Sequence, residues 1–314
     1  MTKQAVRIIT IDEEKAGQRI DNFLKNVCKG VPTSHIYRLL RTGQIRVNKK
    51  RIKAPYRLME GDELRLPPME VAHEAPKKFI GSSLLQEIES RILYEDDKLM
   101  VVNKPAGIAV HGGSGVNLGM IEVLRQLRPR GPSLELAHRL DRETSGVLII
   151  AKKRKILKEL HELLRSRAVT KEYEALLHGI LPKTHLKVDV PLLKNTLTSG
   201  ERMVKVDKTG KSAVTHFELQ ESFPNASYVK IRIESGRTHQ IRVHAQHIKH
   251  SIVGDEKYGH RESDKALVPP ELSRLYLHAK RISFTLSDGT KMDIEAPLDE
   301  KFKKMIRYLG GLKR

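Results

Sequence analysis

The 314-residue sequence has no tryptophan, a single cysteine and only 4% aromatic residues. The one cysteine, Cys28, excludes an internal disulfide and any zinc site built from several cysteines. The scarcity of aromatic rings argues against a surface that stacks many successive bases. No apolar run approaches the roughly 20 residues that a membrane-spanning helix needs. The simplest interpretation is a soluble protein of a reducing cytoplasm.

Acidic residues are also in short supply relative to basic ones. The chain has 58 lysines and arginines against 38 aspartates and glutamates, which gives a net charge of +20. A basic balance of this size indicates a polyanionic partner, with nucleic acid the first candidate and an anionic membrane surface the second. The length suits one large domain with a small one beside it.

Residues 1–70 are predicted to form a small module. Ile20, Phe23, Leu24 and Val27 recur at helical spacing. Ser34 is a candidate N-cap for a second helix that ends at Gly43, and short strands are expected over 45–47 and 64–66. From Arg38 to Arg57 the sequence has eight basic residues and no acidic one. On a helix and the hairpin after it, these residues would form one positive face suited to phosphates, although a plain solvated surface is the alternative.

Residues 71–88 are predicted to be a linker, because they follow a Pro-Pro pair and show no sustained hydrophobic period. Residues 89–314 would then form the larger domain. Its pattern predicts strands over 92–94, 99–102 and 147–151 and a helix over 152–167. Further strands are expected over 169–177, 214–219 and 228–233.

The stretch from Ala137 to Lys152 changes from charged to apolar, so a loop is predicted to lead into the buried strand over 147–151. Asp141 lies in this loop between Arg139 and Arg142. A carboxylate close to guanidinium groups stays ionised, which suits an anionic nucleophile better than a general base. Spacing alone also allows an ordinary surface ion cluster.

Two later segments carry candidate functional side chains. Tyr173 lies in the strand predicted over 169–177, where the pattern alone indicates a core aromatic. Arg237 follows Gly236, at the corner between a strand and a helix whose apolar positions include Ile241 and Ala245. Such corners commonly carry functional side chains, but a phosphate contact or a structural pair is equally open for Arg237.

Four histidines, His239, His244, His247 and His250, lie close together in the sequence. Their spacing does not reproduce a His-Glu-x-x-His zinc motif. We therefore expect a basic helix near RNA rather than a metal site.

The loop around Asp141 reads His-Arg-Leu-Asp-Arg-Glu-Thr-Ser-Gly. It resembles the signature loop of the RluA-type pseudouridine synthases, in which this Asp is the catalytic nucleophile. The segments Lys-Pro-Ala-Gly at 104–107, Lys-Glu-Tyr at 171–173 and Ser-Gly-Arg-Thr-His-Gln at 235–240 resemble further motifs of that family. The resemblance extends over nearly the whole chain.

The resemblance implies a role for each matched residue. Asp141 would be the nucleophile, and Arg237 would pair with it. Tyr173 would pack against the uracil and is the candidate base for the C5 proton. Arg139 would fill the space that a flipped-out nucleotide leaves. Lys104 would support the loop that carries Asp141 and is not expected to be catalytic.

Residues 17–62 also resemble the S4 RNA-binding domain. In that family the second helix and the hairpin after it contact RNA. The contact candidates implied here are Arg38, Arg41, Arg46, Lys49 and Arg51.

The implied fold is α+β, with a mixed, mostly antiparallel central sheet crossed by a cleft and a small N-terminal S4-like α/β domain. The implied function is isomerisation of specific uridines in large-subunit (23S) ribosomal RNA to pseudouridine. This reaction exchanges no electrons and loses no group, so no cofactor or metal is expected. The partner would be ribosomal RNA or a pre-ribosomal particle. The protein would be a cytoplasmic monomer that binds no membrane.

Two other functions remain open. A non-catalytic RNA-binding ribosome assembly factor would need the basic surface but not Asp141, Tyr173 and Arg237 together. An RNA N-glycosidase would need a second carboxylate, such as Glu143, to activate water. The isomerase hypothesis requires the Asp141 carboxylate to lie beside the Arg237 guanidinium and to be open to a nucleoside.

Overall fold

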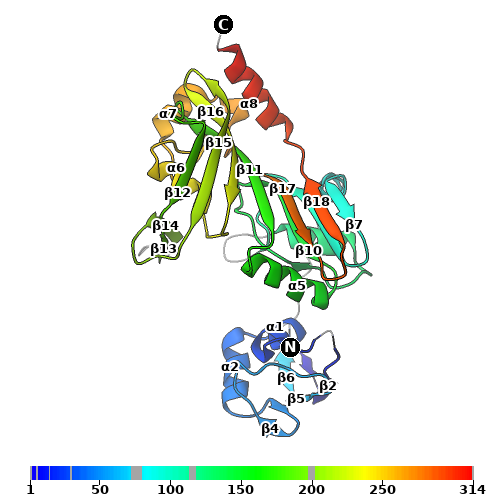
Figure 1. Cartoon of the computed structure of the whole chain (residues 1–314). Helices are drawn as coiled ribbons and strands as arrows, with labels where there is room; N and C mark the ends of the chain where they lie inside the picture. The colour runs from blue at the N-terminus through cyan, green and yellow to red at the C-terminus, as the bar shows by residue number, and fades with distance from the viewer. Residues whose placement is uncertain are drawn as a thin grey trace. The chain divides into compact units, whose positions relative to one another are not determined.

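The computed structural model describes residues 2–4, 6–13, 15–28, 30–71, 80–112, 118–196 and 202–312. The chain divides into two compact units, Met1–Gly81 and Ser82–Arg314 (Figure 1). The domain limits drawn from the sequence, 1–70 and 89–314, stay a prediction. Most of the linker expected between them, residues 72–79, lies outside the described residues.

The first unit packs two helices against a four-stranded sheet. The sheet order is β2 (Arg7–Thr10), β5 (Glu63–Leu66), β3 (Arg46–Val47), β4 (Lys50–Arg51), and β1 (Thr2–Gln4) pairs with β6 (Met69–Val71) outside it. The helices are α1 (Ile20–Val27) and α2 (Thr33–Arg41). Their apolar positions meet in one core, in which Phe23, Leu24, Ile36 and Leu40 are buried. The helical spacing noted in the sequence is therefore confirmed.

One local prediction in this unit is wrong. Helix α2 begins at Thr33, two residues earlier than an N-cap at Ser34 implies, with Pro32 in the N-cap position and no side-chain cap bond. The proline ring fixes the backbone at φ −56°, which leads directly into the helix without a capping hydroxyl. The turn between β3 and β4 has left-handed Asn48 and Lys49, at φ 49° and 65°, as a two-residue hairpin requires.

The second unit is built on one ten-stranded sheet. The main path is β12 (His185–Asp189), β15 (Val214–Phe223), β16 (Ala226–Ile233), β11 (Thr170–His178), β17 (Leu277–Thr285), β10 (Ser145–Ala151), β8 (Leu99–Lys104), β7 (Ile92–Glu95). In addition β18 (Lys291–Glu295) pairs with β17, and β9 (Glu135–Leu136) pairs with β10. Only the β10–β17 pair is parallel, so the sheet of the described residues is mixed and mostly antiparallel, as expected. Figure 1 shows β11 between the two halves of this sheet.

Helices cover the sheet through separate apolar clusters. The remaining elements are α3 (Ser82–Glu89), α4 (Met120–Leu127), α5 (Arg154–Arg165), the hairpin β13 (Leu192–Thr196) and β14 (Arg202–Val206), α6 (Gln240–His247), α7 (Arg261–Leu267), the 3₁₀ turn Pro270–Leu272 and α8 (Glu300–Gly311). Helix α5 packs Ile156 and Leu160 against Val147 and Ile149 of β10. Helix α6 packs Ile241 into the cluster formed by β11, β15 and β16. Each half of the sheet thus has its own core.

Strand β10 holds the loop that precedes it. All seven of its residues are buried. Its pairing with β17 brings Gly146 opposite Ala279. Gly146 has φ +110°, and a Cβ there would lie 2.2 Å from the carbonyl oxygen of Ala279. Only glycine fits, because both the left-handed backbone and the close strand contact exclude a side chain.

Substitution of Gly146 by alanine is expected to lower the free energy of unfolding by about 3 kcal/mol or more, through backbone strain and overpacking together. Gly289→Ala is the matched control, because Gly289 also has a positive φ, +85°, but nothing lies within 4 Å of its added Cβ. That variant should lose only about 1 kcal/mol. Denaturant titration of both proteins measures the difference, and equal losses would contradict the proposed clash.

Candidate active site

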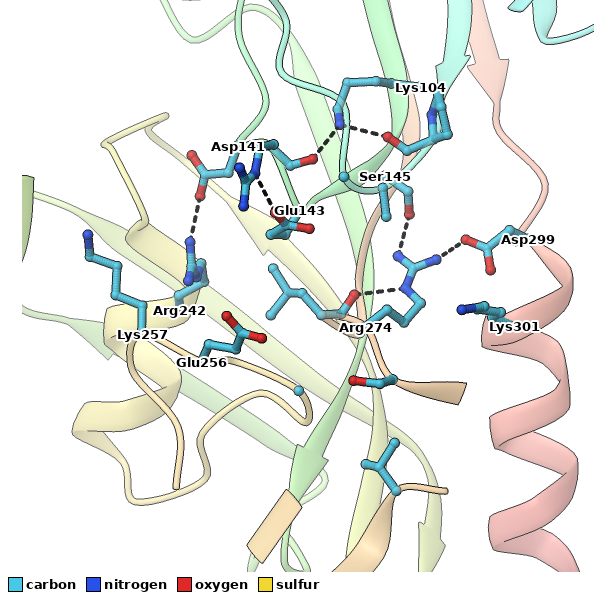
Figure 2. A pocket seen from close by; sticks show the side chains of 18 of the residues that line it. Lys104, Asp141, Glu143, Ser145, Arg242, Glu256, Lys257, Arg274, Asp299 and Lys301 are labelled. Atoms are coloured by element: carbon cyan, nitrogen blue, oxygen red, sulfur yellow. Dashed lines mark hydrogen bonds and ion pairs between the residues drawn. The ribbon is translucent and has the colours of Figure 1, made fainter. Parts of the chain in front are cut away.

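The second unit has a groove of about 1470 Å³ that is rich in charged side chains. Its walls come from the loop before β10, the start of α6, the segment after α6 and the first residues of α8 (Figure 2). Asp141 and Arg139 both line it. The groove shows that Asp141 is open to a ligand, which was one of the two requirements of the isomerase hypothesis.

A buried lysine holds the loop that carries Asp141. Lys104, at the end of β8, donates from Nζ to the carbonyl oxygens of Pro105 (2.8 Å), Ile108 (2.8 Å) and Arg142 (2.9 Å). The Gly107 N–H donates to the same Arg142 oxygen at 2.9 Å. Burial lowers the pKa of the Lys104 ammonium to about 7. The contacts of Lys104 go to backbone, which fits the supporting role expected for it.

The cation beside Asp141 is Arg242 of α6. Its Nη1 lies 3.4 Å from Asp141 Oδ2, and the Asp141 side chain is 19% exposed. Asp255 holds the Arg242 guanidinium in place. Nε donates to Asp255 Oδ2 at 2.8 Å, and Nη2 donates to Asp255 Oδ1 at 2.7 Å. Burial alone would lower the pKa of Arg242, but its bonds to Asp255 and the nearby Asp141 charge outweigh burial and raise it. Arg242 is therefore a rigid, permanently charged partner.

The expected pair between Arg237 and Asp141 is wrong. Arg237 is exposed, and its Nε donates to the carbonyl oxygen of Ser212 at 3.3 Å. Arg237 lies in the corner before α6 begins, whereas Arg242 lies inside the helix, where its side chain faces the loop before β10. The required cation beside Asp141 is therefore not Arg237 but Arg242, five residues further along the chain.

Gln240 fixes that helix start. Its Oε1 accepts hydrogen bonds from Ser235 Oγ (2.7 Å) and the Arg237 N–H (3.1 Å). Its Nε2 donates to Val214 O (2.9 Å) and Thr215 Oγ1 (3.1 Å) on β15. A buried amide with four partners ties the corner to the sheet. This places Arg242, two residues further along, against Asp141.

A histidine completes the surroundings of Asp141. Nε2 of His239 lies 3.7 Å from Asp141 Oδ2, and Nδ1 lies 2.8 Å from the hydroxyl of Tyr258. Sequence reasoning missed Arg242, Asp255 and Tyr258, and it placed His239 on a basic helix near RNA rather than beside Asp141. The available signal was weak, namely the three-residue spacing of His239 and Arg242, which places them on one helix face.

The other predicted site residues occupy different surroundings. Tyr173 of β11 is half-buried and packs against the cluster under α6. It is not part of the groove lining in the described residues. Burial raises the pKa of the Tyr173 hydroxyl, and the charge of Asp141 raises it further.

Arg139 is exposed at the groove, whereas Arg142 donates from Nε to Glu143 Oε1 at 2.6 Å. The expected cluster around Asp141 thus does not include Arg142.

A third cation with a buried side chain, Arg274, fixes the start of β10. Arg274 donates from Nη2 to Ser145 Oγ at 2.8 Å and from Nε to Leu275 O at 2.9 Å, and it pairs with Asp299, the N-cap of α8 (Figure 2). Ser145 Oγ also contacts His278 Nδ1 at 2.8 Å. Burial lowers the pKa of the Arg274 guanidinium to about 10. This network joins β10, β17 and α8 at one wall of the groove.

The clustered histidines have separate partners. His244 contacts Thr215 Oγ1 (2.9 Å) and Val190 O (3.1 Å), and His250 contacts His178 O (2.8 Å). Within the described residues, no three or more His, Cys, Asp or Glu side chains gather to hold a metal ion.

None of the described helices combines the length and the apolar character needed to cross a bilayer.

The S4-like contact candidates lie on α2 and on the β3–β4 hairpin of the first unit. All five are exposed: Arg38, Arg41, Arg46, Lys49 and Arg51. Arg46 Nε donates to Gly43 O at 3.1 Å, so its head group is held next to the end of α2. Exposure is what a phosphate contact requires, and their RNA contacts stay a prediction.

The comparisons with known proteins agree with the fold. Residues 98–247 match the family model described as RNA pseudouridylate synthase, and residues 18–64 match the S4 domain. Curated relatives that share 50% of their residues with this chain align over 97% of it. The chain therefore belongs to the RNA pseudouridylate synthase family.

Several of these relatives are named ribosomal large subunit pseudouridine synthase C, among them the following two. The protein from Escherichia coli (strain K12) is 50% identical over 312 residues, which cover 97% of each chain. The protein from Pasteurella multocida (strain Pm70) is 50% identical over 98% of this chain and 94% of its own. Among solved structures, human RNA pseudouridylate synthase domain containing 4 superposes with a TM-score of 0.61 at 26% identity, covering 73% of this chain and 96% of that one.

Proposed function

We propose that this chain isomerises specific uridines of large-subunit (23S) ribosomal RNA to pseudouridine, with Asp141 as the nucleophile. Relatives that are 50% identical over nearly the full length carry the name of such an enzyme. The observation that carries the proposal for this chain is the Asp141 carboxylate in the groove, with Arg242 and His239 both on Oδ2. This arrangement leaves Oδ1 as the oxygen that can attack.

The chemistry needs a nucleophile and an everted base. The N1–C1′ bond breaks, the uracil turns, and C5 is joined to C1′; C5 then loses its proton and N1 takes one up, so no atoms are gained or lost overall. Asp141 attacks C1′ or C6 to form a covalent adduct that breaks again before the product leaves, and the charge of Arg242, 3.4 Å away, orients the carboxylate. Eversion costs on the order of a few kcal/mol for unstacking. Contacts between RNA phosphates and a basic protein surface offset that cost.

The proposal gives Tyr173 and Arg139 supporting parts. Tyr173 packs against the uracil. The raised pKa of its hydroxyl means that the side chain is a neutral phenol rather than a phenolate when the substrate binds. Arg139, exposed at the groove, fills the space left by the everted nucleotide, because a planar guanidinium can stack as well as bind phosphate. Arg237 is left with a contact to the RNA backbone from its exposed corner.

The remaining parts of the proposal concern the compartment, the oligomeric state and the form of the RNA substrate. The protein acts as a cytoplasmic monomer on ribosomal RNA, either free or within a pre-ribosomal particle. A single buried cysteine suits a reducing compartment. Size-exclusion chromatography with light scattering tests the monomer, and comparison of naked RNA with assembly intermediates tests the substrate.

Release of tritium from C5-tritiated large-subunit RNA tests the function directly. The isomerase predicts tritium release together with a C–C linked nucleoside at defined positions. RNA binding without tritium release would instead favour the assembly factor, and abasic sites would favour the N-glycosidase. Comparing pseudouridine maps from cells with and without the protein then identifies the modified uridines.

The S4-like surface is expected to control affinity rather than chemistry. Replacing Arg46 and Lys49 with alanine removes two phosphate contacts and should raise KM roughly tenfold, reducing the salt slope of binding by about 2. The single-turnover rate at saturating enzyme should change less than twofold. Lys304→Ala on α8 is the control for loss of exposed positive charge. An equal effect of that substitution would contradict a specific S4 contact.

A further inference from the structure

His239 has a backbone conformation that its position does not explain. It is the N-cap of α6, yet its φ and ψ are 52° and 20°, in the left-handed region. N-cap residues normally adopt extended angles, and their side chains bond the first turn. The His239 side chain makes no such bond. Strain of this kind at a non-glycine residue persists only where the surrounding structure imposes it, and it is concentrated at functional sites.

The contacts of Tyr258 assign the proton on the His239 ring. The Tyr258 hydroxyl accepts a hydrogen bond from the Val204 N–H at 3.0 Å, so its own proton is available for another partner. Nδ1 of His239 lies 2.8 Å from that hydroxyl. We assign Nδ1 as the acceptor, which places the proton of the neutral ring on Nε2. Nε2 is the atom that faces Asp141.

The imidazole stays neutral in these surroundings. Burial lowers the pKa of His239, and the charges of Arg242 and Lys257 lower it further, against the opposing effect of Asp141 and Asp255. A neutral donor orients the carboxylate without cancelling its charge. At 3.7 Å the Nε2–Oδ2 contact is longer than a hydrogen bond, as is common before a substrate closes a site.

We propose that His239 is a positioning residue for the isomerisation: held by Tyr258, it donates Nε2–H to Asp141 Oδ2 in the substrate complex and so turns Oδ1 toward the nucleoside. Arg242 approaches the same Oδ2 at 3.4 Å. Two donors on one oxygen define the rotation of the carboxylate, which a single ion pair at this distance does not. This inference rests on the proposed function.

Two variants of His239 distinguish the position of its Nε2 donor from its left-handed backbone conformation. Asparagine tolerates left-handed angles well, and its amide can replace Nδ1 in the contact with Tyr258, but it is too short to replace Nε2. Glutamine is strained in this conformation but places its amide near the position of Nε2. His239→Ala and His239→Asn should therefore lower the single-turnover rate about 10- to 100-fold. His239→Gln should recover most of that loss, with RNA affinity within twofold in all three.

A structural role for His239 would give the opposite order. Asparagine would then rescue better than glutamine, and the thermal stability of the variants would follow their activity. That order, or an unchanged rate in His239→Ala, would overturn the inference. His247→Ala on the exposed side of α6 is the matched control. Wild-type protein is assayed in parallel, because absence of pseudouridine there would instead refute the proposed function.

Tyr258→Phe tests the assignment of the ring proton. Without the hydroxyl, the His239 ring is free to move its proton to Nδ1, and the rate should fall several-fold. In the His239→Ala background the same substitution should have no further effect on rate, since coupled residues act non-additively. Independent, multiplicative losses would contradict the link from Tyr258 through His239 to Asp141.

Discussion

Asp141→Asn should abolish pseudouridine formation, with a loss on the order of 10⁴-fold or more in the single-turnover rate, while RNA still binds. The amide is close in shape to the carboxylate but carries no charge and is a far poorer nucleophile. Tritium release from C5-labelled RNA measures the rate, and filter binding measures affinity. Affinity should remain within about threefold of wild type, because most of it comes from phosphate contacts elsewhere on the basic surface.

The matched control is Asp293→Asn on β18, where an exposed carboxylate pairs with Arg281. It makes the same chemical change away from the groove and should leave the rate unchanged. Turnover that survives in Asp141→Asn would remove Asp141 from its role. Abasic product that disappears in Glu143→Gln would show that a second carboxylate activates water, as a glycosidase needs.

The sequence predicted those parts of the fold that depend on local spacing. The apolar periods of α1, α5 and α6 and the buried strand β10 each result from short-range rules. The start of α2 was misplaced by two residues because a proline, rather than a capping hydroxyl, precedes the helix. Such boundaries depend on a few degrees of backbone angle.

The arrangement around Asp141 could only be predicted in part. The loop and its carboxylate were found because their residues are contiguous. The paired cation was assigned to Arg237 rather than Arg242, because the choice depends on where Gln240 fixes the beginning of α6. Asp255 and Tyr258 lie in a separate segment, and nothing in their local pattern indicates that they pack behind Arg242 and His239. These contacts are tertiary, so spacing along the chain does not encode them.

Arg242→Met is expected to damage both stability and activity, for separable reasons. It leaves Asp255 as a fully buried carboxylate without its cation, which should cost about 3–5 kcal/mol of the free energy of unfolding. It also removes the charge beside Asp141, which should lower the rate about 10³-fold. Denaturant titration and tritium release measure the two losses.

A second substitution distinguishes these effects. In Arg242→Met/Asp255→Asn the orphaned charge is gone, so most of the lost stability should return. Activity should not return, because Asp141 still lacks its cation. Arg242→Lys is the complementary variant, since an ammonium keeps the charge but cannot bind both oxygens of Asp255 and reach Asp141 with one rigid fork. If activity returned together with stability in the double variant, Arg242 would be a structural residue, and the orientation of Asp141 would need another cause.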